Sequence, residues 1–329
     1  MKHPQENFPS YTPPAYLFNK HVQTIVPALF RRVKEIKYER ERIDTPDGDF
    51  LDLDWSYTAN SRQKLVIVSH GLEGDANRPY VKGMVRAFNQ AGYDALAWNY
   101  RGCSGEMNRL PRFYHSGATE DLQVVLEHAI HKKRYTEVVL NGFSLGGNLT
   151  LKYLGELPLA SRGDGFASAI RKAIVFSVPL DLHDCLKELS RPGNFVYSRR
   201  FLRNLKEKVR RKAVLMPEEV DASPLKDIKD LKTFDNLYTS ILHGFRDAVD
   251  YYEQCSSISF LDHITVDTLI INAANDPFLG PSCYPLHELK NHPTISLEVP
   301  EQGGHCGFAD SHHTGLYWSE RRALQFLDQ

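Results

Sequence analysis

The sequence predicts an α/β fold with a mostly parallel central sheet. Three observations predict it: β-branched runs recur along the chain, helical patterns separate them, and a hairpin pattern stands near the start. A continuous apolar run is typical of a strand that is buried on both faces of a parallel sheet. Such runs occur at 65–68, 95–98, 138–140, 173–176 and 268–271.

The first two strands are expected to be antiparallel. Residues 37–43 and 50–55 flank the turn signal at 46–49, and the second run alternates apolar with acidic residues, as a hairpin should. Beyond them, apolar residues recur every three or four positions in three segments, 80–91, 121–132 and 148–154. Strand and helix therefore alternate, which favours parallel pairing.

Two segments lie outside this alternation. Residues 1 to about 34 are predicted to be an extension that packs on the main domain, which spans 35–329. Between about 180 and 259 the pattern becomes helical, and we interpret this stretch as an inserted helical cap over the sheet. The alternative is a set of helices that only lengthens the core. A basic run at 199–212 is most often a solvated helix face.

The composition narrows the classes of partner. The chain has 329 residues, of which 42% are hydrophobic and 25% are charged, as in a globular protein that folds alone. A net charge of -1 gives no electrostatic reason to expect nucleic acid. The five cysteines are scattered, which favours reduced thiols. No signal peptide or membrane-spanning run is evident, so we expect a cytoplasmic protein without integral membrane association. The oligomeric state stays open.

The candidate nucleophile is Ser144. Residues 142–146 form the motif G-x-S-x-G, directly after the run 138–140 and directly before a helical pattern. Gly142 and Gly146 have no side chain to clash at the strained turn that the motif forms, and the helix N-terminus favours developing negative charge. An ordinary strand-to-helix turn is the alternative interpretation.

A serine needs a base, and in this motif class an acid and then a histidine follow along the chain. His305 lies in a glycine-containing loop after the apolar run 295–299, in the expected order. Position favours it over His312 and His313, which lie too close to the final helical pattern. We therefore predict that His305 is the base.

The candidate acid is Asp276. It follows the run 268–271, in the loop beyond the carboxyl end of a strand, where sheets of this class bind ligands. Asp267 stands at the beginning of that strand and Asp262 before it, so either is expected to be a capping or solvated residue. A purely structural role for Asp276 is the alternative.

An oxyanion requires two backbone donors. One is predicted to be the N–H of Leu145, directly after the nucleophile, and the second is the N–H of Leu72, in the loop after the run 65–68. The glycines of that loop are also compatible with a phosphate, but neither nucleotide-binding glycine motif is present. We expect no cofactor and no metal.

These motifs together resemble the YheT-like branch of the α/β-hydrolases. The resemblance covers nearly the whole chain and includes residues 21–25, 70–74, 99–105, 142–147, 251–256, 275–277 and 303–305. It implies an α/β-hydrolase fold and carboxylic-ester hydrolysis, with Ser144, Asp276 and His305 in the triad positions. Relatives include fungal medium-chain ethyl-ester synthases/esterases and animal abhydrolase-domain lipid hydrolases. Arg101 and Cys103 match a branch motif without an evident role, and a structural turn is their alternative.

The predicted function is a serine carboxylic-ester hydrolase that acts through an acyl-enzyme on a small-molecule, short- to medium-chain acyl ester. The first alternative is transfer of the acyl group to an alcohol with the same triad. The second, from another class, is a non-catalytic binding protein, although such proteins usually lose a triad residue.

Overall fold

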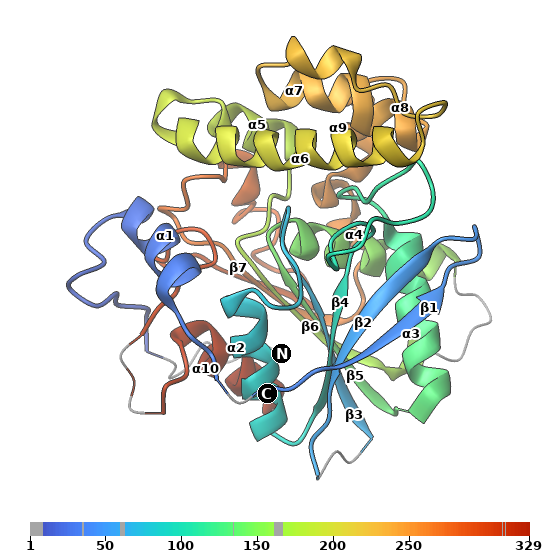
Figure 1. Cartoon of the computed structure of the whole chain (residues 1–329). Helices are drawn as coiled ribbons and strands as arrows, with labels where there is room; N and C mark the ends of the chain where they lie inside the picture. The colour runs from blue at the N-terminus through green and yellow to red at the C-terminus, as the bar shows by residue number, and fades with distance from the viewer. Residues whose placement is uncertain are drawn as a thin grey trace.

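The computed structural model describes residues 9–34, 36–59, 63–133, 135–160, 167–310, 312 and 314–329. Within them an eight-stranded sheet forms the centre of the molecule (Figure 1), in the order β1-β2-β4-β3-β5-β6-β7-β8. The strands are β1 (Glu39–Asp44), β2 (Phe50–Ser56), β3 (Lys64–Ser69), β4 (Asp94–Asn99), β5 (Glu137–Phe143), β6 (Ile170–Phe176), β7 (Asp267–Ile271) and β8 (Ile295–Glu298).

The pairing confirms the predicted fold class. β2 pairs antiparallel with β1 and with β4, and all later pairs are parallel. β5 is longer than its apolar run because it continues through Asn141 and Gly142 to Phe143. The Asn141 side chain is buried there and donates to the carbonyl of Ile174 at 2.8 Å, so a polar residue is accommodated at the strand end.

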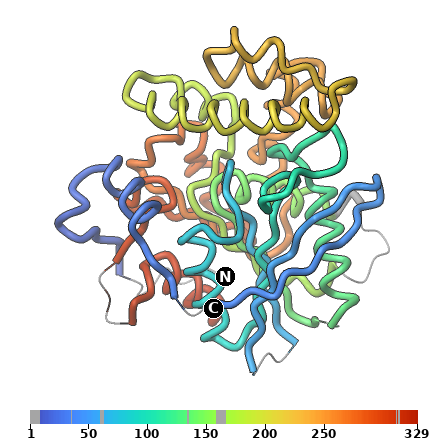
Figure 2. The backbone as a smooth tube through the Cα atoms, viewed as in Figure 1, coloured from blue at the N-terminus to red at the C-terminus, as the bar shows by residue number. Residues whose placement is uncertain are grey.

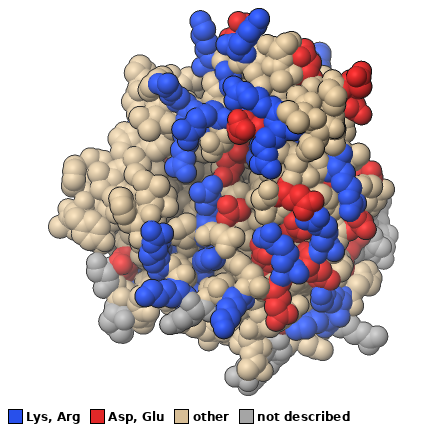
Figure 3. All heavy atoms as spheres, in the orientation of Figure 1, with Lys and Arg blue, Asp and Glu red and all other residues tan. Residues whose placement is uncertain are grey.

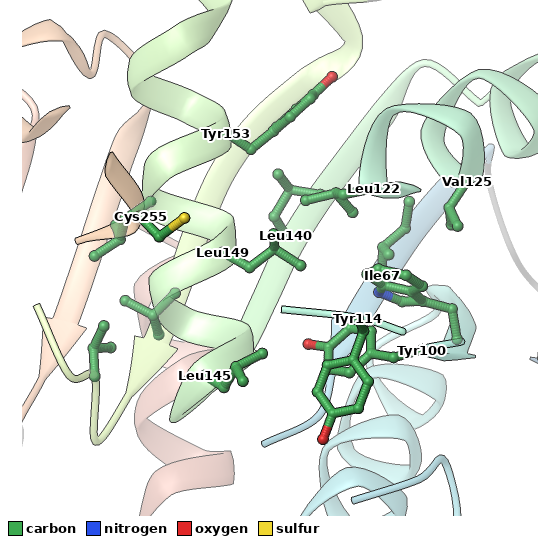
Figure 4. Close-up of a cluster of buried hydrophobic side chains, with 14 of the residues drawn as sticks. Ile67, Tyr100, Tyr114, Leu122, Val125, Leu140, Leu145, Leu149, Tyr153 and Cys255 are labelled. Carbon is green, nitrogen blue, oxygen red and sulfur yellow. The ribbon is translucent and has the colours of Figure 1, made fainter. Parts of the chain in front are cut away.

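Alternate strand residues face two helical layers. Leu65 and Ile67 pack toward α3 (Thr119–Lys133) and α4 (Leu145–Ala160), and Figure 4 shows this cluster. Val66 and Val68 pack toward α2 (Pro79–Gln90) and α10 (Trp318–Leu327) on the opposite face. None of the helices in the described ranges is both long enough and apolar enough to cross a membrane.

Helices between β6 and β7 lie together at one end of the sheet (Figure 1). This α5–α9 segment falls within residues 180–259, for which the sequence predicts a cap. The bounds of that cap stay a prediction. Its helices are α5 (Leu182–Leu189), α6 (Phe195–Leu215), α7 (Leu231–Phe234), α8 (Ser240–His243) and α9 (Ala248–Cys255).

Short helical turns occur within this segment and elsewhere in the chain. The 3₁₀ turns are η1 (Ala167–Ala169), η2 (Pro192–Asn194), η3 (Ser223–Lys226), η5 (Ser257–His263) and η6 (Pro281–Cys283), and η4 (Asp235–Thr239) is a π-helical turn.

The basic run on α6 differs from the predicted solvated face, because part of it is buried. Lys212 is fully buried, and its Nζ donates to Asn108 Oδ1 at 2.7 Å and to the carbonyls of Leu110 and Arg112. Burial lowers the pKa of Lys212 to about 8. The lysine therefore joins α6 to the core, whereas Arg199, Arg200 and Arg203 are exposed.

The N-terminal segment, predicted only as an extension, contains a helix, α1 (Lys20–Phe30). Residues 1–8 of that extension lie outside the described residues. Figure 2 shows the segment that includes α1 beside the chain that precedes α10. Tyr11 OH donates to the carbonyl of Ala309 at 2.9 Å, which ties the two ends of the sequence together.

Candidate active site

Ser144 lies at a sharp turn between β5 and α4. Its φ of 53° is in the left-handed region, and its amide donates to the carbonyl of Phe176 at 2.9 Å, which holds the turn against the neighbouring strand. A Cβ on Gly142 would collide with the carbonyl oxygen of Gly146, and one on Gly146 would collide with that of Ser69. Both positions therefore require glycine.

The predicted base and acid meet at this serine. His305 Nε2 is 2.9 Å from Ser144 Oγ, and His305 Nδ1 is 3.0 Å and 2.9 Å from the two carboxylate oxygens of Asp276. Asp276 is 5% exposed, and its Oδ1 accepts the amide of Phe278 at 2.9 Å. This arrangement fixes the ring so that Nε2 faces the hydroxyl and can accept its proton.

The electrostatics of His305 follow from its buried carboxylate partner. Burial alone disfavours the imidazolium and lowers the pKa of His305, but the Asp276 carboxylate and the neighbouring Cys306 together raise that pKa above its usual 6.5. The Phe278 ring, 4.1 Å from the imidazole between centroids, covers one side of the pair. The histidine is therefore a stronger base than a free imidazole.

Helix α1 positions the loops that carry the acid and the base. The fully buried Gln23 accepts from Asn275 Nδ2 at 2.9 Å and from the amide of Gly303 at 3.0 Å. Thr24 Oγ1 accepts the amide of His305 itself at 2.9 Å. Neither residue is predicted from the sequence to have a role of its own, although two adjacent polar residues within an apolar segment indicate a face that meets polar partners.

The two predicted oxyanion donors lie next to Ser144. A Cβ on Gly71 would stand 3.2 Å from Ser144 Cβ, so the loop that contains Leu72 approaches the serine closely. Leu145 directly follows the serine, at the beginning of α4. Within the described residues, neither the Leu72 amide nor the Leu145 amide donates to a protein acceptor. Both N–H groups therefore remain candidates for the oxyanion donors.

The loop at 70–74 is held by two tyrosine hydroxyl groups and an ion pair. Tyr80 OH accepts the Gly71 amide at 3.0 Å, and Tyr114 OH accepts the Glu73 amide at 2.9 Å. The carboxylate of Glu73 pairs with Lys208 of α6 at 2.7 Å. Because Glu73 has a φ of 55°, its backbone is strained, and these contacts keep it in place. The loop is thus tied to the α5–α9 segment.

His70, the first residue of that loop, is not a second base. It is completely buried, and its Nε2 accepts the Tyr100 amide at 3.3 Å while Nδ1 lies 2.8 Å from the Gly71 carbonyl. Burial lowers the pKa of His70 to about 3, so the ring stays neutral. Its role is to fix the loop.

The other residues considered from the sequence lie elsewhere. Asp262 and Asp267 are exposed, His312 contacts Thr314, and His313 lies outside the described residues. Arg101 binds Asp121 at 2.6 Å and also pairs with Asp47 and Asp49 of the β1–β2 turn. Cys103 is partly buried and lies 2.9 Å from Lys208 Nζ. In the structure Arg101 holds a turn, and Cys103 belongs to the contacts around Glu73.

Two cavities in the described part of the chain reach Ser144 and His305. The α1 cavity, of about 150 Å³, is lined by α1, the loop at 71–74 and the first half of α6. The lining of the α5 cavity, of about 140 Å³, includes six leucines of the α5–α9 segment and the loop after β7: Leu182, Leu186, Leu189, Leu205, Leu231 and Leu279. The serine therefore lies where two differently lined spaces meet.

Comparisons with known proteins agree with this architecture. Residues 64–311 match the family described as the alpha/beta hydrolase fold. The solved structure of the Pyrococcus furiosus esterase Pf2001 has a TM-score of 0.58 at 16% identity, covering 89% of this chain and 91% of that one. An esterase from Exiguobacterium antarcticum has a TM-score of 0.53 at 19% identity, covering 88% and 100%. At these identities the structures show the fold alone.

Curated relatives are more similar in sequence. The Escherichia coli protein named "Putative esterase YheT" is 36% identical over 88% of this chain and 84% of its own length. The mouse phospholipase ABHD3 is 28% identical over 92% and 74%, and a Saccharomyces cerevisiae monoacylglycerol lipase is 28% identical over 90% and 68%. The chain therefore belongs to the α/β-hydrolases of the esterase and lipase type, in the YheT-like branch.

Proposed function

We propose that this protein hydrolyses carboxylic esters through an acyl-enzyme on Ser144. The observation that carries the proposal is the continuous chain of contacts from Ser144 Oγ through the His305 ring to Asp276. Ser144 Oγ attacks the ester carbonyl carbon while His305 Nε2 takes its proton, and Asp276 stabilises the imidazolium that forms. The resulting oxyanion is held by the N–H groups of Leu72 and Leu145.

Three further proton transfers, all through His305, complete the cycle. His305 returns its proton to the leaving alkoxide oxygen, the carbon–oxygen bond to the alcohol breaks, and the acyl group stays on Ser144. A water molecule then gives a proton to His305 and attacks the acyl carbon, and the acid leaves as the serine is reprotonated. The N–H groups of Leu72 and Leu145 stabilise the oxyanion in both halves of the reaction, so the mechanism requires no further charged group.

The α5 cavity fits the acyl chain. Its leucines offer an apolar wall beside Ser144, and burial of each methylene there contributes about 0.8 kcal/mol. One wall is polar, because the Asp235 carboxylate accepts from Tyr252 OH at 2.7 Å and Thr239 Oγ1 at 2.6 Å. Burial raises the pKa of Asp235 to about 6. An acyl chain that reached this wall would cut the carboxylate off from water and leave it only these two hydrogen bonds, which is unfavourable.

We therefore expect a preference for short- to medium-chain acyl groups. Because 0.8 kcal/mol corresponds to about a fourfold rate difference, kcat/KM should rise about fourfold per methylene until the cavity is filled, and then fall. The measurement is kcat/KM for p-nitrophenyl esters from acetyl to palmitoyl below their critical micelle concentrations. A steady rise to palmitoyl contradicts the assignment of the acyl chain to this cavity.

The raised pKa of His305 predicts an alkaline activity profile. Only the neutral imidazole accepts the serine proton, so a pKa above 6.5 means that kcat/KM rises with pH through and beyond neutrality. Asp276→Asn removes the carboxylate and should move the apparent pKa of the remaining activity down. A profile that is already flat at pH 6 in the wild type would contradict the proposed electrostatics.

Acyl transfer is the second candidate, and the two cavities favour it. An acyl chain in the α5 cavity leaves the α1 cavity open to an alcohol, which could replace water at the acyl-enzyme. The same triad carries out both reactions. The ratio of ester to acid formed from an activated acyl donor, at increasing ethanol concentration, distinguishes them.

A further inference from the structure

Large exposed hydrophobic side chains gather beside the α1 cavity. Phe18 and Phe30, which flank and end α1, are 76% and 69% exposed, and Phe195 and Val196 at the beginning of α6 are 58% and 69% exposed. Within the described residues, the other large hydrophobic side chains exposed in this way lie in 16–30 or 195–241, with the exception of Leu286. A cluster of exposed apolar side chains of this kind is typical of an interaction surface.

The two elements form one continuous surface around the cavity. The ring of His21 on α1 stacks on Tyr197 of α6 at 5.8 Å, and His21 Nδ1 lies 3.1 Å from Tyr197 OH. Leu29 is 49% exposed and Arg200 is also exposed, yet both line the α1 cavity. The cavity therefore reaches the molecular surface between α1 and α6.

The same surface carries a strong positive charge. Helix α6 contains eight basic residues and one acidic residue, although the whole chain has a net charge of -1. Lys208 and Lys212 face the core, whereas Arg199, Arg200 and Arg203 are exposed and form no ion pair with a described acidic residue. Figure 3 shows the surface over α1 as uncharged, with lysine and arginine side chains gathered beside it along α6.

We propose that this surface, consisting of residues 16–30 and the outer side of α6, docks on an anionic lipid bilayer. Exposed phenylalanines enter the boundary between headgroups and acyl chains, and neighbouring arginines bind lipid phosphates. Nucleic acid would match the arginines but leave Phe18 and Phe30 in water. A symmetric contact with a second copy would cover the phenylalanines but bring two basic α6 helices together.

Docking in this way directs the mouth of the α1 cavity at the lipid. An ester could then enter the cavity from the membrane and meet Ser144. This access route rests on the proposed function, whereas docking itself does not.

The test is co-sedimentation of the full chain with vesicles of ether-linked phosphatidylcholine, alone or mixed with ether-linked phosphatidylglycerol, which an esterase cannot degrade. Two double variants change the surface. Arg199→Gln/Arg203→Gln removes two of its positive charges, and Phe18→Ser/Phe30→Ser removes two of its exposed aromatic rings. The matched control is the double variant Arg171→Gln/Leu286→Ser, because both residues are exposed and lie outside the proposed docking surface. Hydrolysis of p-nitrophenyl butyrate reports the catalytic state of each protein separately from binding.

We expect the wild type and the control to bind the mixed vesicles, more weakly as salt is added. The arginine variant should lose a factor on the order of tenfold or more in partition coefficient. The phenylalanine variant should lose a similar factor. All should hydrolyse the soluble ester alike. No binding by the wild type, or binding by both surface variants that is as tight as that of the wild type, overturns the proposal. The wild type could also prove to be a dimer that becomes monomeric in the Phe18→Ser/Phe30→Ser variant. That result would assign the surface to a second copy of the chain and would also overturn the proposal.

Discussion

Ser144→Ala should abolish ester hydrolysis while leaving the fold intact. The variant removes only the oxygen that lies 2.9 Å from His305 Nε2, and it keeps the Cβ and the strained backbone of the turn. When the nucleophile of a triad is lost, the remaining residues cannot act as a unit, so we expect kcat to fall by a factor on the order of 10⁶. The measurement is kcat on the best p-nitrophenyl ester, together with the melting temperature.

The melting temperature separates a lost nucleophile from a lost fold. The proposed role requires a melting temperature close to that of the wild type and a residual rate due only to the oxyanion donors and binding. Activity within about tenfold of the wild type removes Ser144 from the mechanism.

Asp276→Asn should reduce kcat by a factor on the order of 10⁴, if triads on different folds behave alike. The amide has nearly the shape of the carboxylate, so the loop that contains Phe278 should keep its position. Its NH₂ group, however, can donate to His305 Nδ1 and thereby hold the ring in the tautomer whose Nε2 carries a proton. In that tautomer Nε2 cannot accept the serine proton. Steady-state kinetics at several pH values provide the measurement.

Asp262→Asn and Asp267→Asn are the matched controls, since both residues are exposed and neighbour the same strand. They should leave kcat nearly unchanged. A large loss in either, with a mild effect of Asp276→Asn, would show that the acid was assigned to the wrong residue.

The sheet could be predicted because its strands are apolar on both sides. Leu65 to Val68 and Leu269 to Ile271 pack between two helical layers, so burial leaves a local signal in each run. The candidate triad could be located because its residues follow strand ends in a fixed order. These inferences need only the chain order and the local pattern.

The contributions of α1 and α6 could not be predicted in this way, because they depend on distant partners. The Gln23 side chain accepts the amide of Gly303, 280 residues away, and no local pattern indicates such a pair. The Asn19 side chain caps α1 by accepting the amides of His21 and Val22, and this cap was a usable helix signal. Lys208 and Lys212 belong to a run that looks solvated, and only the fold shows that they face inward.

Labelling with a fluorophosphonate followed by peptide mass spectrometry tests the catalytic account most directly. The reagent phosphonylates a serine only when a neighbouring base makes its hydroxyl nucleophilic. We predict a single adduct on Ser144 in the wild type, and a labelling rate in His305→Ala that is lower by a factor on the order of 10³ or more. An adduct on another residue, or equal labelling rates in the wild type and His305→Ala, would contradict the proposed catalytic triad.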